Sequence, residues 1–299
     1  MADNATITVG IVGTGKMGSR MARNLLDAGM NVVVSNRSQA SVKDLVASGA
    51  VDGGSLAGVA DAADIVITSL TNQQSVHDVY LGERGLVVNA RKGQIYVDTS
   101  TNPPELPREI AEALEARGAR FLDAPVSGGT AGAEAGTLTM MIGGDETTLE
   151  DARPVLDVIC AHLHHLGSVG SGTVVKLINQ LLVGIHMAAV AEGLVLGAKA
   201  GADPRRMLEV LSTSFGGSRM LDRGVPLIVE RIFDGGTPVD VIRKDLGIIH
   251  DVASSLGVPL ATGLEASRVF DRASDAGYGD YDMTAIVLPL EDIAGVEVI

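Results

Sequence analysis

The chain has 299 residues, and its 23 basic and 37 acidic side chains give a formal net charge of −14. That acidity argues against a nucleic-acid-binding scaffold, which normally carries a basic face, and the 46% share of hydrophobic residues argues against a disordered chain. The single cysteine, Cys160, excludes an intrachain disulfide framework and a cysteine-rich zinc site, so we expect no metal. A single cysteine fits a reducing compartment. The acidic residue Asp3 also fits a cytoplasmic protein, because a secretion signal carries positive charge near its start.

The most apolar long stretch runs from Ile178 to Ala198, and polar side chains interrupt it at Asn179, Gln180, His186 and Glu192. Such interruptions are rare in membrane-spanning helices. We therefore expect no membrane partner.

The first half of the chain alternates short apolar runs with segments of helical periodicity. Lys16–Ala28 places Met17, Met21 and Leu25 four residues apart, which predicts a helix, and Pro104–Arg117 begins a second helix at a proline. Strands are expected at Ile7–Val12, Asn31–Ser35, Asp64–Ser69, Gln94–Val97, Arg120–Leu122 and Leu138–Ile142. This alternation predicts an α/β fold whose doubly wound, mostly parallel sheet has helices on both faces.

The second half changes to helices alone. One long helical pattern runs from Gly172 to about Ala200, and later helices are expected at Pro204–Ser212, Val239–Leu256 and Leu260–Ala276. We place the boundary at the glycine-rich turn Gly167–Gly172. The sequence thus predicts an α/β domain over residues 1–167 and an all-α domain over residues 168–299, joined by the long helix.

A glycine motif follows the first expected strand and begins the first expected helix. Its residues are Gly13, Thr14, Gly15, Lys16, Met17 and Gly18. In this strand–turn–helix context Gly13 permits a tight turn, Gly15 lets the backbone approach a pyrophosphate, and Gly18 lets the helix lie close to the sheet. The motif predicts a Rossmann-type dinucleotide-binding domain with phosphates at the helix start.

The end of the second strand bears on which dinucleotide binds. An NAD site usually carries an acid there to hold the ribose hydroxyls, but no acid occurs between Asn31 and Val42. The segment instead reads Asn36, Arg37 and Ser38, whose side chains suit a 2′-phosphate. We therefore favour NADP as cofactor and keep NAD as the alternative.

Five motifs in order along the chain resemble the β-hydroxyacid dehydrogenase family. They are the nucleotide signature Val9–Leu25, Asp98–Pro103 (DTSTNP), Asp123–Gly129 (DAPVSGG), Gly172–Gln180 (GTVVKLINQ) and Lys244–Leu246 (KDL). The run Ile178–Gly197 looks closer to the branches that act on L-threonate and tartronate semialdehyde, and the chain lacks the tryptophan of the hydroxyisobutyrate branch. The resemblance implies transfer of a hydride between a nicotinamide and a short-chain 3-hydroxy acid or its semialdehyde.

The resemblance also implies roles for particular residues. Lys176 would be the catalytic residue, with Asn179 as its substrate partner, and the turn Ser127, Gly128 and Gly129 would hold the substrate carboxylate. Contacts with the cofactor would come from Leu70, Thr71, Ser75 and Thr101, and Lys244 would lie at the closed site. A homodimer or homotetramer is implied as well.

The residues around Lys176 support such chemistry. The lysine falls in the first turns of the long helix among Val174, Val175, Leu177 and Ile178. Desolvation and the positive end of the helix dipole both disfavour an ammonium, so its pKa is expected to fall toward neutrality, where an amine serves as a general base. The other interpretation is a lysine that extends to solvent from an amphipathic helix.

Cationic and histidine side chains give further candidates. Arg219 and Lys244 supply positive charge that suits a carboxylate, or else they are surface charges. His162, His164 and His165 cluster near the domain boundary, but no acid or cysteine pattern completes a metal site. His186 is expected to be an interior histidine rather than a substrate contact.

Two other functions compete with hydroxy-acid oxidoreduction. Relatives that reduce imines replace the lysine, so Lys176 argues against that activity. A non-catalytic NADP-binding interaction module would usually add basic tails or extra domains, and this chain shows neither.

Overall fold

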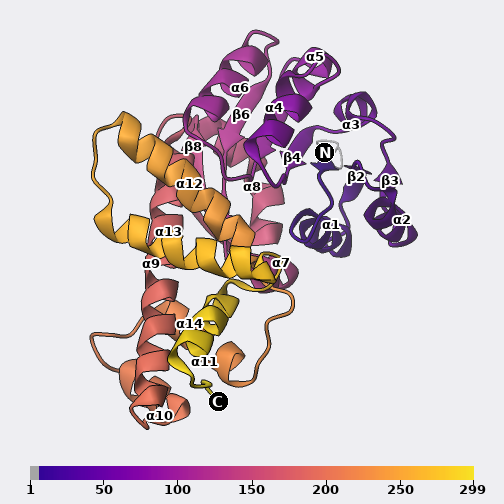
Figure 1. The fold of residues 1–299 in the computed structure, drawn as a ribbon. Helices are drawn as coiled ribbons and strands as arrows, with labels where there is room; N and C mark the ends of the chain where they lie inside the picture. Colours follow the sequence, from indigo (N-terminus) through magenta and orange to yellow (C-terminus); the bar gives the residue numbers. More distant parts are fainter. Residues whose placement is uncertain (1–6) are drawn as a thin grey trace. The chain divides into compact units, whose positions relative to one another are not determined.

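The computed structural model describes residues 7–299, and the chain divides into two compact units between Lys176 and Leu177. The first unit contains the sheet and the second is helical, so the predicted fold class is confirmed (Figure 1). The predicted boundary at residue 167 precedes the long helix α9, Ser171–Lys199, whereas the division falls inside that helix.

The first unit has one sheet of nine strands in the order β3-β2-β1-β4-β5-β6-β8-β7, with β9 paired to β8. The strands are β1 Thr8–Val12, β2 Asn31–Ser35, β3 Val51–Asp52, β4 Ile65–Thr68, β5 Ile95–Asp98, β6 Arg120–Asp123, β7 Val126–Ser127, β8 Leu138–Gly144 and β9 Cys160–His165. The first six are parallel to one another, and β8 runs antiparallel to β6 and β7.

The central strands are buried along their whole length, which explains their β-branched composition. A parallel strand covered by helices on both faces has no solvent side, so it is apolar throughout rather than alternating. One core on the sheet gathers Met21 and Leu25, and a second gathers Tyr80 and Ile110. The two cores make this the doubly wound arrangement that the sequence predicts.

The helices of the first unit connect these strands. They are α1 Gly18–Asp27, α2 Gln39–Ala47, α3 Leu56–Ala62, α4 Gln73–Leu81, α5 Leu86–Asn89, α6 Glu105–Glu115, α7 Gly129–Ala135 and α8 Glu146–Ile159. Several have side-chain caps: Ser55 begins α3, Asn72 begins α4 and Asp145 begins α8, each accepting a backbone N–H of the first turn. Such caps satisfy amide groups that lack a partner within the helix.

The strand β9 is a difference from the sequence prediction. His162, His164 and His165 lie on it, in parallel register with β8. The run of apolar residues typical of a buried strand is absent here, because β9 is an edge strand that pairs only with β8. Cys160 begins this strand, and burial raises the pKa of its thiol to about 12.

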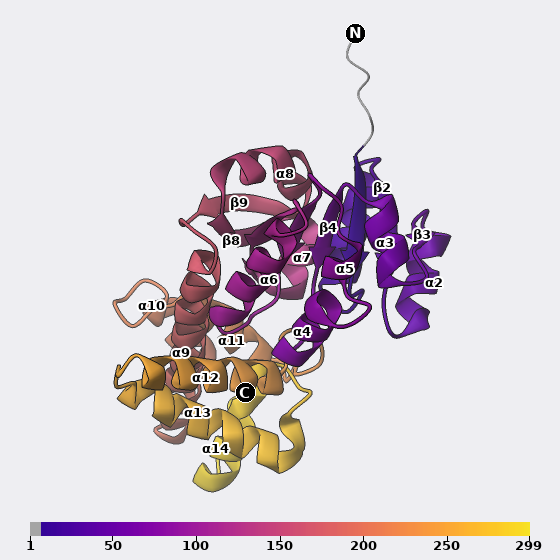
Figure 2. The same cartoon turned by 90° about the horizontal axis from the view of Figure 1, so that it is seen from above.

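The second unit consists of helices packed on one apolar core. After α9 come α10 Pro204–Leu211, α11 Arg219–Val229, α12 Val239–Ser255, α13 Ala261–Ala273, a π turn Ser274–Tyr278, a 3₁₀ turn Met283–Ile286 and α14 Val287–Ala294. Figure 2 shows α12 and α13 side by side, and Arg243 of α12 donates to Asp271 of α13 at 2.7 Å. The sequence patterns did not predict α11, whose interior holds Pro226, or α14.

The long helix α9 is, among the described residues, the one helix long and apolar enough to cross a membrane, by length and composition only; 39% of its most apolar window is buried. Core helices of soluble proteins pass the same test. The prediction for His186 is wrong, because its side chain is exposed on this helix.

Candidate active site

The glycine loop between β1 and α1 has the geometry that its spacing predicts. Gly13 has φ +91, in the left-handed region, and a Cβ there would overlap the carbonyl oxygen of Ser69. A Cβ on Gly18 would overlap the carbonyl oxygen of Gly13, so α1 begins in close contact with the loop. Gly15 is exposed, and a Cβ there would meet nothing within 4 Å. The loop therefore fits a dinucleotide: open space remains where a pyrophosphate would approach.

Hydrogen bonds connect this loop to the end of β2. The Thr14 and Ser41 hydroxyls lie 2.6 Å apart, and the Asn36 amide donates to Ser41 Oγ at 3.3 Å and to the Ser38 carbonyl at 3.1 Å. The side chains of Arg37 and Ser38 are exposed. Of the three residues suited to a 2′-phosphate, Asn36 thus has protein partners, while Arg37 and Ser38 face solvent.

The loops after β4 and β5 lie beside the glycine loop. The Leu70 side chain comes near Gly13, and its backbone N–H donates to Ser100 Oγ at 3.0 Å. Thr71 is exposed, and the Ser75 N–H donates to the α4 cap Asn72 at 2.8 Å. These contacts bring two of the proposed cofactor loops together within the first unit.

A carboxylate that the sequence analysis did not single out holds the loop containing Thr101. Asp98 ends β5, is 2% exposed, and accepts hydrogen bonds from Thr68, Ser100 and Asn102 at 2.7–2.8 Å. Burial raises the pKa of the Asp98 carboxyl, and these hydrogen bonds act in the opposite direction. An acid at a strand end followed by Thr, Ser and Asn is the signal that would have indicated it.

The proposed carboxylate-binding turn has a strained backbone that only glycine adopts easily. Ser127 pairs with Thr139 of β8, and then Gly128 and Gly129 take φ values of +131 and +62. Two successive positive φ values require residues without a Cβ. The turn leads directly into α7 at Gly129.

Lys176 lies in the second turn of α9 and is only 7% exposed. This burial excludes the alternative of a lysine extending into solvent. The start of its helix is held by a second carboxylate absent from the predicted set: Asp123, at the end of β6, accepts from the Gly170 and Thr173 amides at 2.7 Å.

In the second unit a chain of polar contacts begins at Asn179. Its amide donates to Gln180 Oε1 at 2.9 Å, and Gln180 Nε2 donates to Asp245 Oδ2 at 2.5 Å. The Lys244 Nζ lies 2.8 Å from Asp245 Oδ1. Asp245 is 1% exposed, so a buried carboxylate joins two predicted site residues, Asn179 and Lys244, that are far apart in sequence. Its place in the KDL motif is the signal that pointed toward it.

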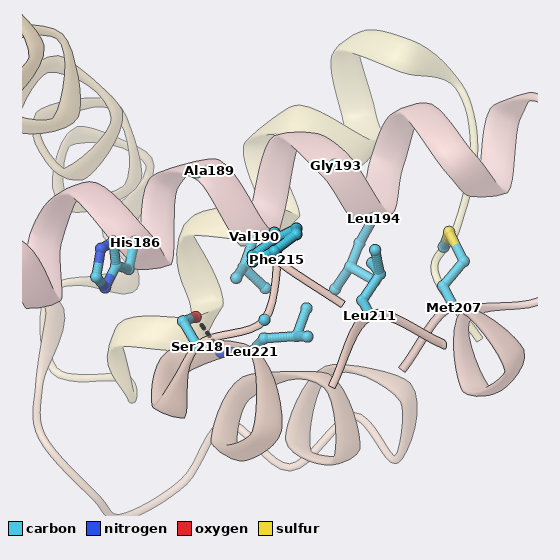
Figure 3. A pocket seen from close by; sticks show the side chains of 12 residues that line it. His186, Ala189, Val190, Gly193, Leu194, Met207, Leu211, Phe215, Ser218 and Leu221 are labelled. Atoms are coloured by element: carbon cyan, nitrogen blue, oxygen red, sulfur yellow. Dashed lines mark hydrogen bonds between the residues drawn. The ribbon is translucent and has the colours of Figure 1, made fainter. Parts of the chain in front are cut away.

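Arg219 is exposed at the start of α11, after the cap Ser218, and no described hydrogen bond joins it to the Asn179–Asp245 chain. Beside it lies a pocket of about 330 Å³ lined by α9, α10, α11 and the loop with Phe215 (Figure 3). His186, the pocket residue on α9 nearest in sequence to Asn179, is seven residues from it, about 10 Å along the helix. None of the residues that line the pocket belongs to the Asn179–Asp245 chain of contacts.

No group of three or more His, Cys, Asp or Glu suited to a metal ion occurs among residues 7–299. His162 and His164 stack with ring centroids 6.3 Å apart, without a carboxylate completing a ligand set. The site described above is thus built from glycine backbone, amide, hydroxyl, carboxylate and amine groups.

A glycine loop of this form at the carboxyl edge of a parallel sheet defines a dinucleotide-binding protein. Residues 8–167 match the model of the NAD binding domain of 6-phosphogluconate dehydrogenase, and residues 170–290 match that of the NAD-binding region of NADP-dependent 3-hydroxyisobutyrate dehydrogenase. A 2-(hydroxymethyl)glutarate dehydrogenase from Eubacterium barkeri is 38% identical over 294 residues, covering 98% of each chain. The chain belongs to the β-hydroxyacid dehydrogenase family, and the predicted NAD(P)-dependent oxidoreductase is confirmed.

Solved structures agree with this assignment. A 3-hydroxyisobutyrate dehydrogenase from Mycobacterium tuberculosis with L-serine has a TM-score of 0.87 at 30% identity, covering 95% of this chain and 99% of that one. Psf3 in complex with NADP⁺ and 2-OPP has a TM-score of 0.87 at 28% identity, covering 94% and 99%. An imine reductase from Bacillus cereus, at 22% identity and a TM-score of 0.61 with 95% and 99% covered, shares the fold alone.

Proposed function

We propose that the protein interconverts a short-chain 3-hydroxy acid and its semialdehyde, with Lys176 as general acid and base. The observation that carries the proposal is the near-complete burial of the residue Lys176 near the start of α9, in the same unit as the glycine loop and the Ser127–Gly129 turn. An amine held next to the substrate hydroxyl is a suitable general acid and base for this reaction.

Each residue of the proposed site has its own role in the reaction. When bound, the nicotinamide supplies the hydride acceptor or donor. In oxidation Lys176 takes the proton of the substrate hydroxyl as the carbonyl forms, and in reduction its ammonium returns that proton. Asn179, one turn further along the helix, orients the hydroxyl, while Ser127, Gly128 and Gly129 bind the carboxylate. Lys244 would supply further positive charge for the substrate carboxylate, and Arg219 is proposed as a further substrate contact.

The names of the relatives support the substrate class. 2-(Hydroxymethyl)glutarate, the substrate named for the Eubacterium barkeri enzyme, and L-serine, present with the Mycobacterium tuberculosis structure, share one feature. Both carry a hydroxyl on the carbon β to a carboxylate. We propose a substrate with this arrangement, or the semialdehyde formed from it, in the class of 3-hydroxyisobutyrate, L-threonate and tartronate semialdehyde.

The experiment is a screen of 3-hydroxy acids and their semialdehydes in both directions, with NADP(H) and NAD(H), followed by absorbance at 340 nm. Turnover of at least one 3-hydroxy acid is expected, with 2-hydroxy acids as controls for the position of the hydroxyl. Cofactor binding without turnover of any acid or imine would instead support a non-catalytic module. Turnover of imines alone would support the imine-reductase alternative.

We further propose NADP as the preferred cofactor, bound by the Gly13–Gly18 loop, by Leu70, Thr71, Ser75 and Thr101, and by Asn36, Arg37 and Ser38 at the 2′-phosphate. The exposed Arg37 guanidinium supports this choice, because it faces solvent at the end of β2 where an NAD site carries an acid. The variant Arg37→Asp is expected to lower the preference for NADP over NAD, measured as a ratio of kcat/KM, by about 100-fold.

The matched control is Arg84→Asp, which changes the charge of another exposed arginine of the same unit by the same amount. It is expected to leave the preference unchanged. An Arg37→Asp variant with the wild-type ratio would exclude Arg37 from selection of the cofactor.

We propose that the protein acts in the cytoplasm and assembles as a homodimer or homotetramer. The support for the oligomer is an exposed apolar face in the second unit, where Ile178, Leu182 and Leu196 of α9 are 47–72% exposed and Phe215 is fully exposed. Burying such a face in another copy removes apolar surface from water. Light scattering at micromolar protein is expected to give two or four times the mass of the chain, and a monomeric mass would overturn the proposal.

A further inference from the structure

Asp123 connects the end of a strand with the start of α9. It ends β6, its side chain is 1% exposed, and its two carboxylate oxygens accept from different amides. Oδ1 accepts from the Gly170 N–H and Oδ2 from the Thr173 N–H, both at 2.7 Å. The Thr173 hydroxyl donates to the same carboxylate. The acid therefore caps a helix whose first residue, Ser171, is far along the chain from it.

Two glycines let the backbone approach this cap closely. A Cβ on Gly143 of β8 would overlap Asp123 Oδ1, and a Cβ on Gly172 would overlap the carbonyl oxygen of Met141. The first turn of α9 is thus held directly against the ends of β6 and β8. Contact this close permits little sliding of the helix along the sheet.

The position of Asp123 relates the two parts of the proposed site that lie in the first unit. Ser127, the first residue of the carboxylate-binding turn, follows Asp123 by four residues, and Lys176 follows Thr173 by three, about one turn of helix. We propose that Asp123 is a positioning residue that fixes Lys176 relative to the Ser127–Gly129 turn. The proposal rests on the function assigned above to Lys176.

The carboxylate is suited to this task in a way that an amide is not. A carboxylate accepts with both oxygens, whereas an asparagine side chain accepts with one and presents an N–H₂ donor with the other. In Asp123→Asn one amide of α9 would face a donor, and the helix start would shift or fray. Displacement of a proton-transfer group by about 1 Å lowers the rate by about 100-fold.

The test compares Asp123→Asn with a matched cap in the same unit. Asp145 begins α8 and accepts from the Thr148 N–H at 2.9 Å, so Asp145→Asn is the control for losing a carboxylate cap. Turnover is expressed per cofactor-binding site, titrated by NADPH fluorescence, so that unfolded protein does not count. Asp123→Asn is expected to lower kcat about 10- to 100-fold at unchanged NADPH affinity, and Asp145→Asn to leave kcat within twofold.

Amide hydrogen exchange provides a readout that needs no substrate. Exchange of residues 170–176 is expected to become about tenfold faster in Asp123→Asn, whereas in Asp145→Asn the change is confined to the start of α8. If Asp123→Asn does not fold, Thr173→Val removes only the hydroxyl donor and is expected to lower kcat by a smaller factor in the same direction. Wild-type exchange in this segment, or wild-type turnover per NADPH site with either variant, would overturn the proposal.

A wild-type enzyme that turns over no hydroxy acid would instead overturn the proposed function. The exchange result would then still decide whether Asp123 caps α9.

Discussion

Replacing Lys176 with alanine is expected to lower kcat for the 3-hydroxy acid identified in the screen by about 10³-fold or more, which is the range for loss of a general acid or base. Without the amine, the proton of the substrate hydroxyl has no acceptor as the carbonyl forms. The affinity for NADPH, measured by fluorescence titration, is expected to stay within a few-fold of wild type, because the dinucleotide loop lies elsewhere in the unit. Steady-state kinetics in both directions checks the result.

Two variants make this test specific. Lys176→Arg keeps a positive charge on a group that does not lose its proton at accessible pH, so it is expected to be nearly as inactive as Lys176→Ala. Lys199→Ala removes the exposed lysine in the last turn of the same helix and is expected to retain full turnover. A Lys176→Ala enzyme within tenfold of wild type would exclude Lys176 as the proton-transfer group.

Two glycines of the dinucleotide loop are expected to affect different properties when changed to alanine, one cofactor binding and the other stability. In Gly15→Ala the new methyl group enters open space, so the thermal stability of the protein is expected to stay near wild type. The same methyl occupies the approach of the pyrophosphate, so the NADPH Kd is expected to rise by about tenfold or more, a cost of roughly 1.4 kcal/mol in binding.

Gly18→Ala is expected to show the reverse pattern, with stability affected first. Its Cβ would overlap the carbonyl oxygen of Gly13, so α1 must move away from the loop. Overpacking of this kind costs about 1–3 kcal/mol of folding free energy. Thermal unfolding without cofactor and NADPH titration together distinguish the two variants, and equal losses of stability in both would contradict the assigned roles of the glycines.

Much of the first unit follows from local patterns. The run Asn31–Ser35 forms the strand predicted for it, and the glycine spacing gives both the left-handed turn at Gly13 and the tight start of α1. Short-range rules work here because buried parallel strands are apolar along their length and a glycine turn needs only its own residues. The helix α11 was missed for a matching reason, because Pro226 inside it argues locally against a helix that tertiary packing maintains.

Local sequence patterns do not predict which side chains of the site are buried. The motif order placed Lys176 at a helix start, but the burial of its side chain is a property of the folded chain. Exposure of His186 likewise depended on which face of α9 the other helices cover, and a helix apolar nearly all round gives no sequence signal for that face.

By itself, then, the sequence determined the dinucleotide loop and most strands of the first unit, since each depends on residues that are neighbours in the chain. The motif resemblance identified the candidate amine. The tertiary structure alone decided that Asp123 caps α9 and that Asp245 joins Gln180 to Lys244. The Gly170 and Thr173 amides lie 47 and 50 residues from Asp123, and Gln180 lies 65 residues from Asp245. A buried acid is tolerated only where the fold brings donors to it.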